Sequence, residues 1–237
     1  MSRATPFDLR TTLMFALVLS GVPSRVTTQQ RALSVDEVTQ ILLSGSEDDF
    51  DMPEFVAAAY GPRAKAALDL ILERPSERGT FVLQLAALTA AQYPRIGVRQ
   101  DLLLDYATGP RLRSLPTELR EVLRTRALKA LSTQPDASLR DFWLQLQSHP
   151  TALYRQFTPF GLACALGATA VPDLEAMSQG TDSTLVRQAS RALREFAERG
   201  ADARVCGPAS RAEAAQFPRE IRPALLSRGE RFLREIP

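Results

Sequence analysis

A row of arginines near the end of the chain is the set of side chains best spaced for a defined chemistry. Arg187, Arg191 and Arg194 lie at i, i+4 and i+7, so a helix would place them along one side. The opposite, apolar side would carry Val186, Ala189, Leu193 and Phe196. Guanidinium groups bind carboxylates and phosphates through paired donors. The row could contact an acidic partner, although the nearby Glu195 and Glu198 also fit an ordinary solvated helix face with i,i+4 pairs.

Residue types that support catalysis or metal binding are sparse. His149 is the single histidine and precedes Pro150 at a predicted turn, so a Ser-His-Asp arrangement would have to use this one side chain. We interpret it as an exposed loop residue. An acidic run that could offer oxygen ligands to calcium lacks the spacing and glycine of an EF-hand loop and is interpreted as a solvated turn: Glu47, Asp48, Asp49 and Asp51. We therefore expect no enzyme activity, no cofactor and no metal site.

The overall charge gives no sign of a dedicated nucleic-acid binder. The 237 residues carry 29 lysines and arginines against 27 acids, a formal net charge of +2. Nucleic-acid-binding domains normally show a marked basic excess. With 45% hydrophobic residues, the chain is long enough and apolar enough to bury a sizeable core.

The first 24 residues have the pattern of a secretory signal peptide. Arg3 and Arg10 precede an apolar run at 11–22, and Val22-Pro23-Ser24 supplies small residues at a cleavage position. The run is shorter than the roughly 20 residues that span a bilayer, and no later segment is expected to reach that length. We expect a periplasmic or secreted protein. A buried first helix is the alternative for this run and would make the protein cytoplasmic.

Helical periodicity dominates the remainder of the sequence. Ser34 and Glu37 have the spacing of a capping box and predict a helix start. Further along, paired amphipathic helices are predicted, with first helices starting near residues 62, 98, 136 and 171, at intervals of about 36, 38 and 35 residues. Pro159 must bend or interrupt the second helix of the third pair. No useful length alternates with period two, so we expect an all-α fold.

Three segments resemble HEAT repeats in the short bacterial form related to phycobilisome-lyase repeats. The clearest unit carries Ala170-Val171-Pro172, Val186-Arg187, Ala189 and Ala192-Leu193, and weaker matches occur at 61–64 and 123–131. The resemblance implies a right-handed α-solenoid of stacked antiparallel helix pairs, with about four repeats and terminal caps. It places Asp182 at an acidic turn position that often pairs with an arginine. It also puts second helices on a concave binding face, which gives these candidate partner contacts: Arg120, Arg124, Arg187, Arg191 and Arg194.

Stacked repeats also suggest a role for the two cysteines. Cys164 and Cys206 would follow the second helices of the third and fourth units, whose ends are adjacent in such an array. We expect a disulfide in an exported protein; in a cytosolic protein they would be small buried hydrophobes. The predicted organisation is a signal peptide at 1–24, a linker and capping helices at 25–60, the array at 61–200 and C-terminal capping helices at 201–237.

The expected function is that of a non-catalytic protein-interaction scaffold or adaptor of the cell envelope. Its partner would be a protein, and its expected state is a monomer with no stable membrane span after signal cleavage. Two alternatives remain at this point. The resemblance to lyase-type repeats allows a bilin-lyase-like enzyme or accessory protein, which would need a pocket. A HEAT-type nucleic-acid-binding protein is the other.

Overall fold

The computed structural model describes residues 31–43, 53, 56–57, 60–200 and 204–206. By its internal contacts the chain divides into residues 1–31, of which only Arg31 is described, and residues 32–237, which contain every element below. The predicted signal peptide, the acidic run at 47–51 and nearly all of the predicted C-terminal caps lie outside the described residues. The described part is mainly helical and contains no strand, which confirms the all-α fold class.

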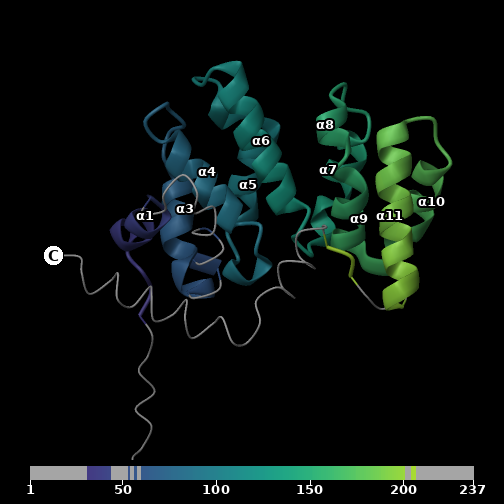
Figure 1. Cartoon of the computed structure of the whole chain (residues 1–237), viewed down its shortest axis with the longest axis horizontal. Coiled ribbons are helices and arrows are strands. Elements are labelled where there is room, and N and C mark those ends of the chain that lie inside the picture. Colours follow the sequence, from purple (N-terminus) through teal and green to yellow (C-terminus); the bar gives the residue numbers. More distant parts are fainter. Residues whose placement is uncertain (1–30, 44–52, 54–55, 58–59, 201–203, 207–237) are drawn as a thin grey trace, which may run out of the picture. The chain divides into compact units, whose positions relative to one another are not determined.

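The described helices form a series of pairs that follow one another in chain order from α3 to α11 (Figure 1). Each pair packs internally, α3 on α4, α5 on α6, α7 on α9 and α10 on α11, and second helices also contact across pairs, α4 with α6 and α9 with α11. The bounds are α1 Val35–Leu43, α3 Lys65–Glu73, α4 Phe81–Ala90, α5 Gln100–Thr108, α6 Thr117–Leu131, α7 Arg140–Leu146, α8 Ala152–Arg155, α9 Thr158–Leu166, α10 Val171–Ser178 and α11 Ser183–Arg199.

Several first helices start where the sequence predicts, and most begin with a short 3-10 turn. These turns are η1 Gly61–Ala64 before α3, η4 Ala137–Leu139 before α7 and η5 Gly167–Ala170 before α10. The capping box is confirmed at the start of α1. The Ser34 amide donates to the Glu37 carboxylate at 2.8 Å, and the Glu37 amide donates to Ser34 Oγ at 3.2 Å.

The effect of Pro159 is also confirmed. The chain is helical in α8 and again in α9, with a turn at Gln156 and Phe157 between them, and Pro159 occupies the first turn of α9. Proline is tolerated in a first turn because the amide there has no partner within the helix. The second helix of the third pair is therefore two helices, a short α8 and a longer α9.

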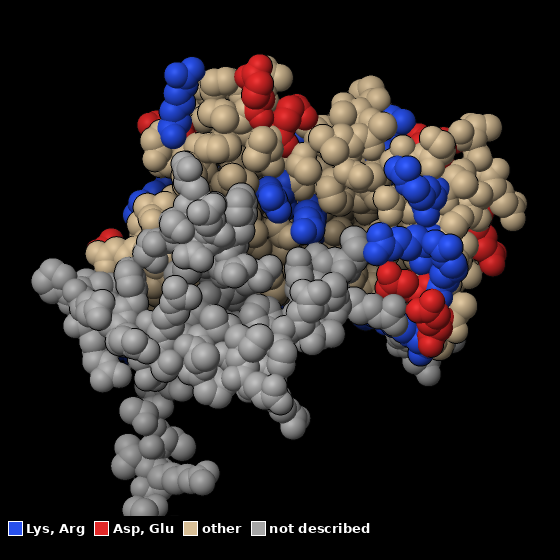
Figure 2. All heavy atoms as spheres, viewed as in Figure 1, with Lys and Arg blue, Asp and Glu red and all other residues tan. Residues whose placement is uncertain are grey.

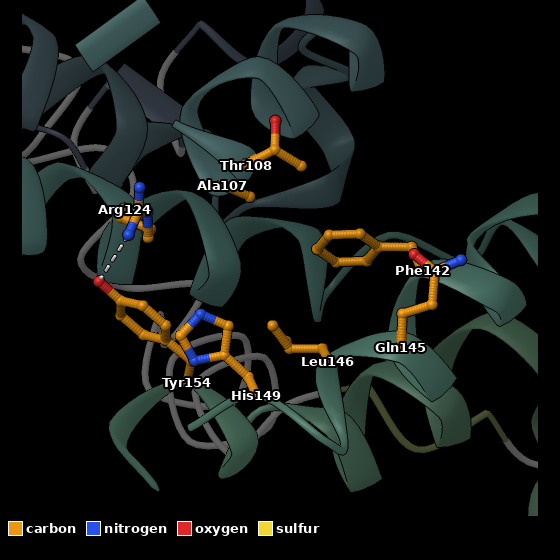
Figure 3. Close-up of a pocket in the computed structure, with 8 residues that line it drawn as sticks. All are labelled: Ala107, Thr108, Arg124, Phe142, Gln145, Leu146, His149 and Tyr154. Atoms are coloured by element: carbon orange, nitrogen blue, oxygen red, sulfur yellow. Dashed lines mark hydrogen bonds between the residues drawn. The ribbon is translucent and has the colours of Figure 1, made fainter. Parts of the chain in front are cut away.

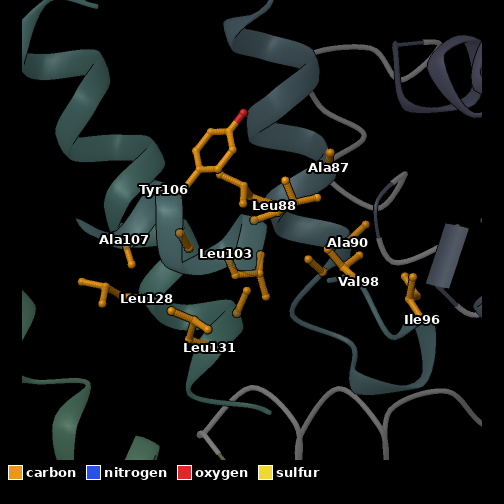
Figure 4. Close-up of a cluster of buried hydrophobic side chains, with 14 of the residues drawn as sticks. Ala87, Leu88, Ala90, Ile96, Val98, Leu103, Tyr106, Ala107, Leu128 and Leu131 are labelled. Carbon is orange, nitrogen blue, oxygen red and sulfur yellow. The ribbon is translucent and has the colours of Figure 1, made fainter. Parts of the chain in front are cut away.

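The core is made where neighbouring pairs meet (Figure 4). Buried side chains from three helices come together: Ala87, Leu88 and Ala90 from α4, Leu103, Tyr106 and Ala107 from α5, and Leu128 and Leu131 from α6. The buried Tyr106 hydroxyl donates to the Leu72 carbonyl at 3.2 Å. Burial raises the pKa of Tyr106 to about 12. Small residues alternate with leucines here, which lets the helices approach closely.

One apolar stretch, Ala152–Ser178, has the length and composition of a membrane-spanning helix. The expectation that no segment after the first 24 residues reaches membrane-spanning length was wrong. Prolines and glycines divide this stretch in the sequence, so it was interpreted as several shorter apolar segments. In the structure it is divided among α8, α9, η5 and α10, and 61% of its most apolar window is buried among other helices. Burial of this kind is typical of core helices.

Cys164 and Cys206 are joined by a disulfide in the structure. Cys164 is fully buried in α9. The segment that carries Cys206 is held beside the end of α9 by Arg204, which donates to the carbonyls of Cys164 and Ala165, each at 3.2 Å, and to that of Pro135 at 2.9 Å. The bond closes a loop that contains α10 and α11.

The first prediction concerns the contact between α7 and α9. Trp143 is completely buried, and a Cβ added at Gly161 would lie 2.2 Å from its ring. Gly161→Ala should therefore lower the free energy of unfolding by about 1–3 kcal/mol, as overpacking does. Denaturant unfolding measures this. Gly79→Ala is the matched control, because nothing lies within 4 Å of the added carbon. Equal effects of the two substitutions would contradict the close contact.

The second prediction concerns the disulfide. Reduction should lower the free energy of unfolding by about 2–4 kcal/mol, because the bond closes a loop with a sequence separation of 42 residues. Thermal unfolding with and without reductant measures the effect, and a Cys164→Ala/Cys206→Ala variant should not respond to reductant. Two free thiols in the mass spectrum of the non-reduced protein would be the contrary result.

Candidate functional site

Three of the five predicted contact residues lie on the exposed side of α11. Arg187, Arg191 and Arg194 are exposed, and basic side chains gather over this helix (Figure 2). Arg191 Nε lies 4.0 Å from the Glu195 carboxylate, and its guanidinium lies 5.7 Å from the centre of the Phe160 ring. Among the described residues, Arg187 and Arg194 form no ion pair within 4.0 Å. Two of these charges are thus left to solvent or to a partner.

The buried side of α11 differs in part from the sequence-based expectation. Ala189 and Phe196 are buried as predicted, but the other fully buried positions are Leu185 and Ala192, while Val186 and Leu193 are half-buried. The reason is that α11 packs against both α10 and α9. Because two helices pack on α11, a wider part of its surface is buried than the single apolar stripe expected from the sequence.

The remaining two predicted contacts, Arg120 and Arg124, lie half-buried on α6. Arg120 donates to the Thr117 hydroxyl on its own helix at 2.9 Å. Arg124 points between α5 and α8 and interacts with residues of both segments, as described next. The structure therefore does not bring the five arginines into one set: three share a face of α11, and Arg124 belongs to a separate cleft.

This cleft has a volume of about 310 Å³ and lies between α5 and α6 on one side and α7 and α8 on the other (Figure 3). Its apolar wall is formed by Ala107, Phe142 and Leu146. Its polar lining consists of Thr108, Arg124, Gln145, His149 and Tyr154. The cleft thus combines one cation and several hydrogen-bonding groups with an apolar wall, which is the usual composition of a small-molecule site.

Tyr154 connects Arg124 to Glu121. Arg124 Nη1 donates to the Tyr154 hydroxyl at 3.3 Å, and that hydroxyl donates to the Glu121 carboxylate. The guanidinium also lies 5.4 Å from the centre of the tyrosine ring. Burial, with the hydrogen bond to Glu121 as a smaller cause, raises the pKa of Tyr154. The phenol is therefore neutral at physiological pH and acts as a hydrogen-bonding bridge.

Arg124 reaches this position because residue 109 is glycine. Gly109 ends α5 with a φ of 86°, a conformation that side chains rarely adopt. A Cβ there would also lie 2.1 Å from Arg124 Nη2. The guanidinium occupies the space that a side chain would fill, so the glycine serves both the helix end and the cleft.

His149 belongs to the cleft wall, which corrects its interpretation as an exposed loop residue. It is half-buried in the turn between α7 and α8. Its Nδ1 accepts a hydrogen bond from the Thr151 amide at 3.0 Å, and its ring lies 4.8 Å from that of Tyr154. Tyr154 itself was missed by the sequence analysis. The available signal was that Tyr154 lies five residues after the single histidine, across a predicted turn and before Pro159.

Arg155 and Asp182 hold α8 and this turn in place. Arg155 Nε donates to the Asp182 carboxylate at 2.7 Å, and its Nη1 donates to the carbonyls of His149 and Pro150 at 2.6 and 2.8 Å. Asp182 is also the N-cap of α11, accepting from the amides of Thr184 and Leu185. The acidic turn position named by the sequence resemblance thus pairs with an arginine of the preceding pair.

In the part of the chain that the structure describes, no group of three or more His, Cys, Asp or Glu residues is arranged to hold a metal ion. Comparison with protein-family models, with curated proteins and with solved structures finds no match to this chain.

The third prediction concerns Asp182. Hydrogen bonds from Leu185 and Thr184, with the Arg155 guanidinium, hold the pKa of Asp182 below its ordinary value of 3.8. The folded state therefore prefers the charged carboxylate more than the unfolded state does. Its contribution to stability is present above about pH 4 and is lost as the pH falls through the lowered folded-state pKa.

Asp182→Asn should lower the melting temperature at neutral pH and flatten its dependence on pH below about pH 5. Thermal unfolding across that range measures both effects. Asp141→Asn is the control, since the Asp141 side chain is 86% exposed and its nearest cation is 3.7 Å away. Parallel loss of stability in the wild type and Asp182→Asn on acidification would contradict the role of the carboxylate.

Proposed function

We propose that the helix pairs form a right-handed α-solenoid of the HEAT type. Its support is the regular order of the elements: first helices recur after 3-10 turns at 61–64, 137–139 and 167–170, with α5 beginning at Gln100. Second helices contact second helices where α4 meets α6 and where α9 meets α11, and α6 meets the third pair through α8. Such contacts are those of stacked repeats, in which each unit covers the apolar face of its neighbour.

The protein is, in this proposal, a non-catalytic binding module for an acidic segment of a protein partner. The observation that carries this is the arginine face of α11, defined as Arg187, Arg191 and Arg194. Two of its three guanidinium groups make no ion pair among the described residues, and all three are exposed. Arginine is enriched at protein interfaces because its planar group binds carboxylates through two donors.

The proposed compartment is the periplasm or the extracellular space. The support is the disulfide between Cys164 and Cys206 together with the signal-like first 24 residues. Disulfides form and persist in oxidising compartments and are rare in the cytosol. A monomer that presents a binding face to an envelope partner fits these features. Binding to DNA is disfavoured by the balanced charge, and duplex DNA is included in the test below.

The fourth prediction tests the binding face. When the purified protein is used to capture partners from an envelope extract of its source cells, acidic proteins should be enriched. Reversal of the three charges, Arg187→Glu/Arg191→Glu/Arg194→Glu, should reduce their recovery by about tenfold or more, because attraction becomes repulsion. Recovery by the wild type should also fall at high salt.

The matched control is a variant with the same change in net charge on exposed arginines in turns outside α11: Arg74→Glu/Arg78→Glu/Arg113→Glu. It should capture as the wild type does. If both triple variants lose the same proteins, the effect is one of net charge and the α11 face is not the site. Salt-dependent binding of random duplex DNA by the wild type would favour the nucleic-acid alternative.

A further inference from the structure

We propose that the cleft between α5, α6, α7 and α8 binds a small organic carboxylate that carries a flat apolar body. The site is separate from the arginine face of α11 and does not depend on the protein-binding function. Its volume of about 310 Å³ lies at the lower end of the range for ligand pockets, which suits a ligand smaller than a typical drug.

The anion would be held by Arg124. Its side chain is only 23% exposed, and among the described residues its guanidinium makes one hydrogen bond, the donation to Tyr154. The Glu121 carboxylate lies 3.8 Å from Nη1, within ion-pair range but too far for a hydrogen bond. The Nε of Arg124 is buried and has no hydrogen-bond partner in the described part of the chain, so a ligand would be held through the Nη groups. A largely buried cation of this kind favours a ligand that brings a negative charge and acceptor oxygens.

His149 supplies a second donor. Because its Nδ1 accepts from the Thr151 amide, the neutral ring carries its proton on Nε2. Among the described residues, Nε2 makes no hydrogen bond. In Figure 3 the imidazole ring lies on the same side of the cleft as Arg124 and Tyr154. In the proposed site, Arg124 and His149 would both donate to the bound carboxylate.

The apolar body would lie against the other side of the cleft. In Figure 3 the Phe142 ring lies across the cleft from Arg124, and the Leu146 side chain lies between Phe142 and His149. Phe142 and Leu146 both pack on the core. Aromatic rings prefer offset or edge contacts with a flat partner. Because the cleft has a cationic end and an apolar end, it favours a ligand with an anionic group at one end and an apolar group at the other.

The charge of Glu121 favours a ligand with a single negative charge over a more highly charged anion. Its carboxylate accepts from Tyr154 and lies near Arg124, so it offsets part of the positive charge. A single negative charge is therefore better matched than the two charges of a phosphate group. This distinction is tested directly by the choice of probes.

The experiment is an amide NMR titration of the full chain with benzoate, which reports affinity and location together. Benzoate should shift the amides of residues 107–108, 124 and 142–154 in a saturable way. Acetate lacks the apolar body, benzyl alcohol lacks the charge, and both should bind at least about tenfold more weakly. Absence of saturable shifts with benzoate would overturn the proposal, as would tighter binding of inorganic phosphate than of benzoate.

Variants make the charge argument specific. Arg124→Gln should weaken benzoate binding about tenfold or more. Because Arg124 also packs against Tyr154 and Gly109, its substitution could disturb the fold. Two variants of the exposed Gln145 therefore test the charge of the ligand separately. Gln145→Lys should strengthen benzoate binding and Gln145→Glu should weaken it, while benzyl alcohol responds to neither. Equal benzoate affinity in both Gln145 variants would contradict an anion in the cleft.

Discussion

The described helices are held together by apolar side chains that are buried where neighbouring helices meet. A helix of 9 or 10 residues such as α3 or α4 is marginal by itself. It becomes stable where leucines and alanines of three helices meet, as Leu88, Leu103 and Leu128 do. Close packing of this kind also occurs between Gly161 and the buried Trp143 ring, where a larger residue would separate α9 from α7.

Pro159 creates the exception from which the cleft arises. Because a proline in a helix interior removes a backbone hydrogen bond, the second helix of the third pair is divided, and its longer part, α9, packs against α7. The short α8 instead contacts α6 and α11. A space is left between α5, α6, α7 and α8, and it is bridged by polar groups, Arg124, Tyr154 and Glu121. The link from Arg155 to Asp182 then fixes α8 to the start of α11.

Most of the features that depend on neighbours in sequence could be predicted, and the Cys164–Cys206 disulfide followed from the expected order of the helices. The details of side-chain packing could not be predicted. The capping box at Ser34, the break at Pro159 and the acidic turn at Asp182 are local and were found. The half-burial of His149 and the role of Tyr154 depend on where α8 lies relative to α6, which no local pattern encodes. Likewise, Arg124 and Arg187 both occupy predicted second helices, and the sequence does not distinguish them. In the structure, Arg124 fits into a cleft beside Gly109, whereas Arg187 is exposed on α11.

The proposed binding of acidic partner segments by the arginine face of α11 can be measured by amide hydrogen exchange of the full chain with and without poly-L-glutamate. If α11 is the binding face, poly-L-glutamate should slow exchange in Ser183–Arg199 at low salt, and this effect should disappear at high salt because exposed ion pairs are screened. Unchanged exchange in α11, with protection confined to other helices, would contradict it.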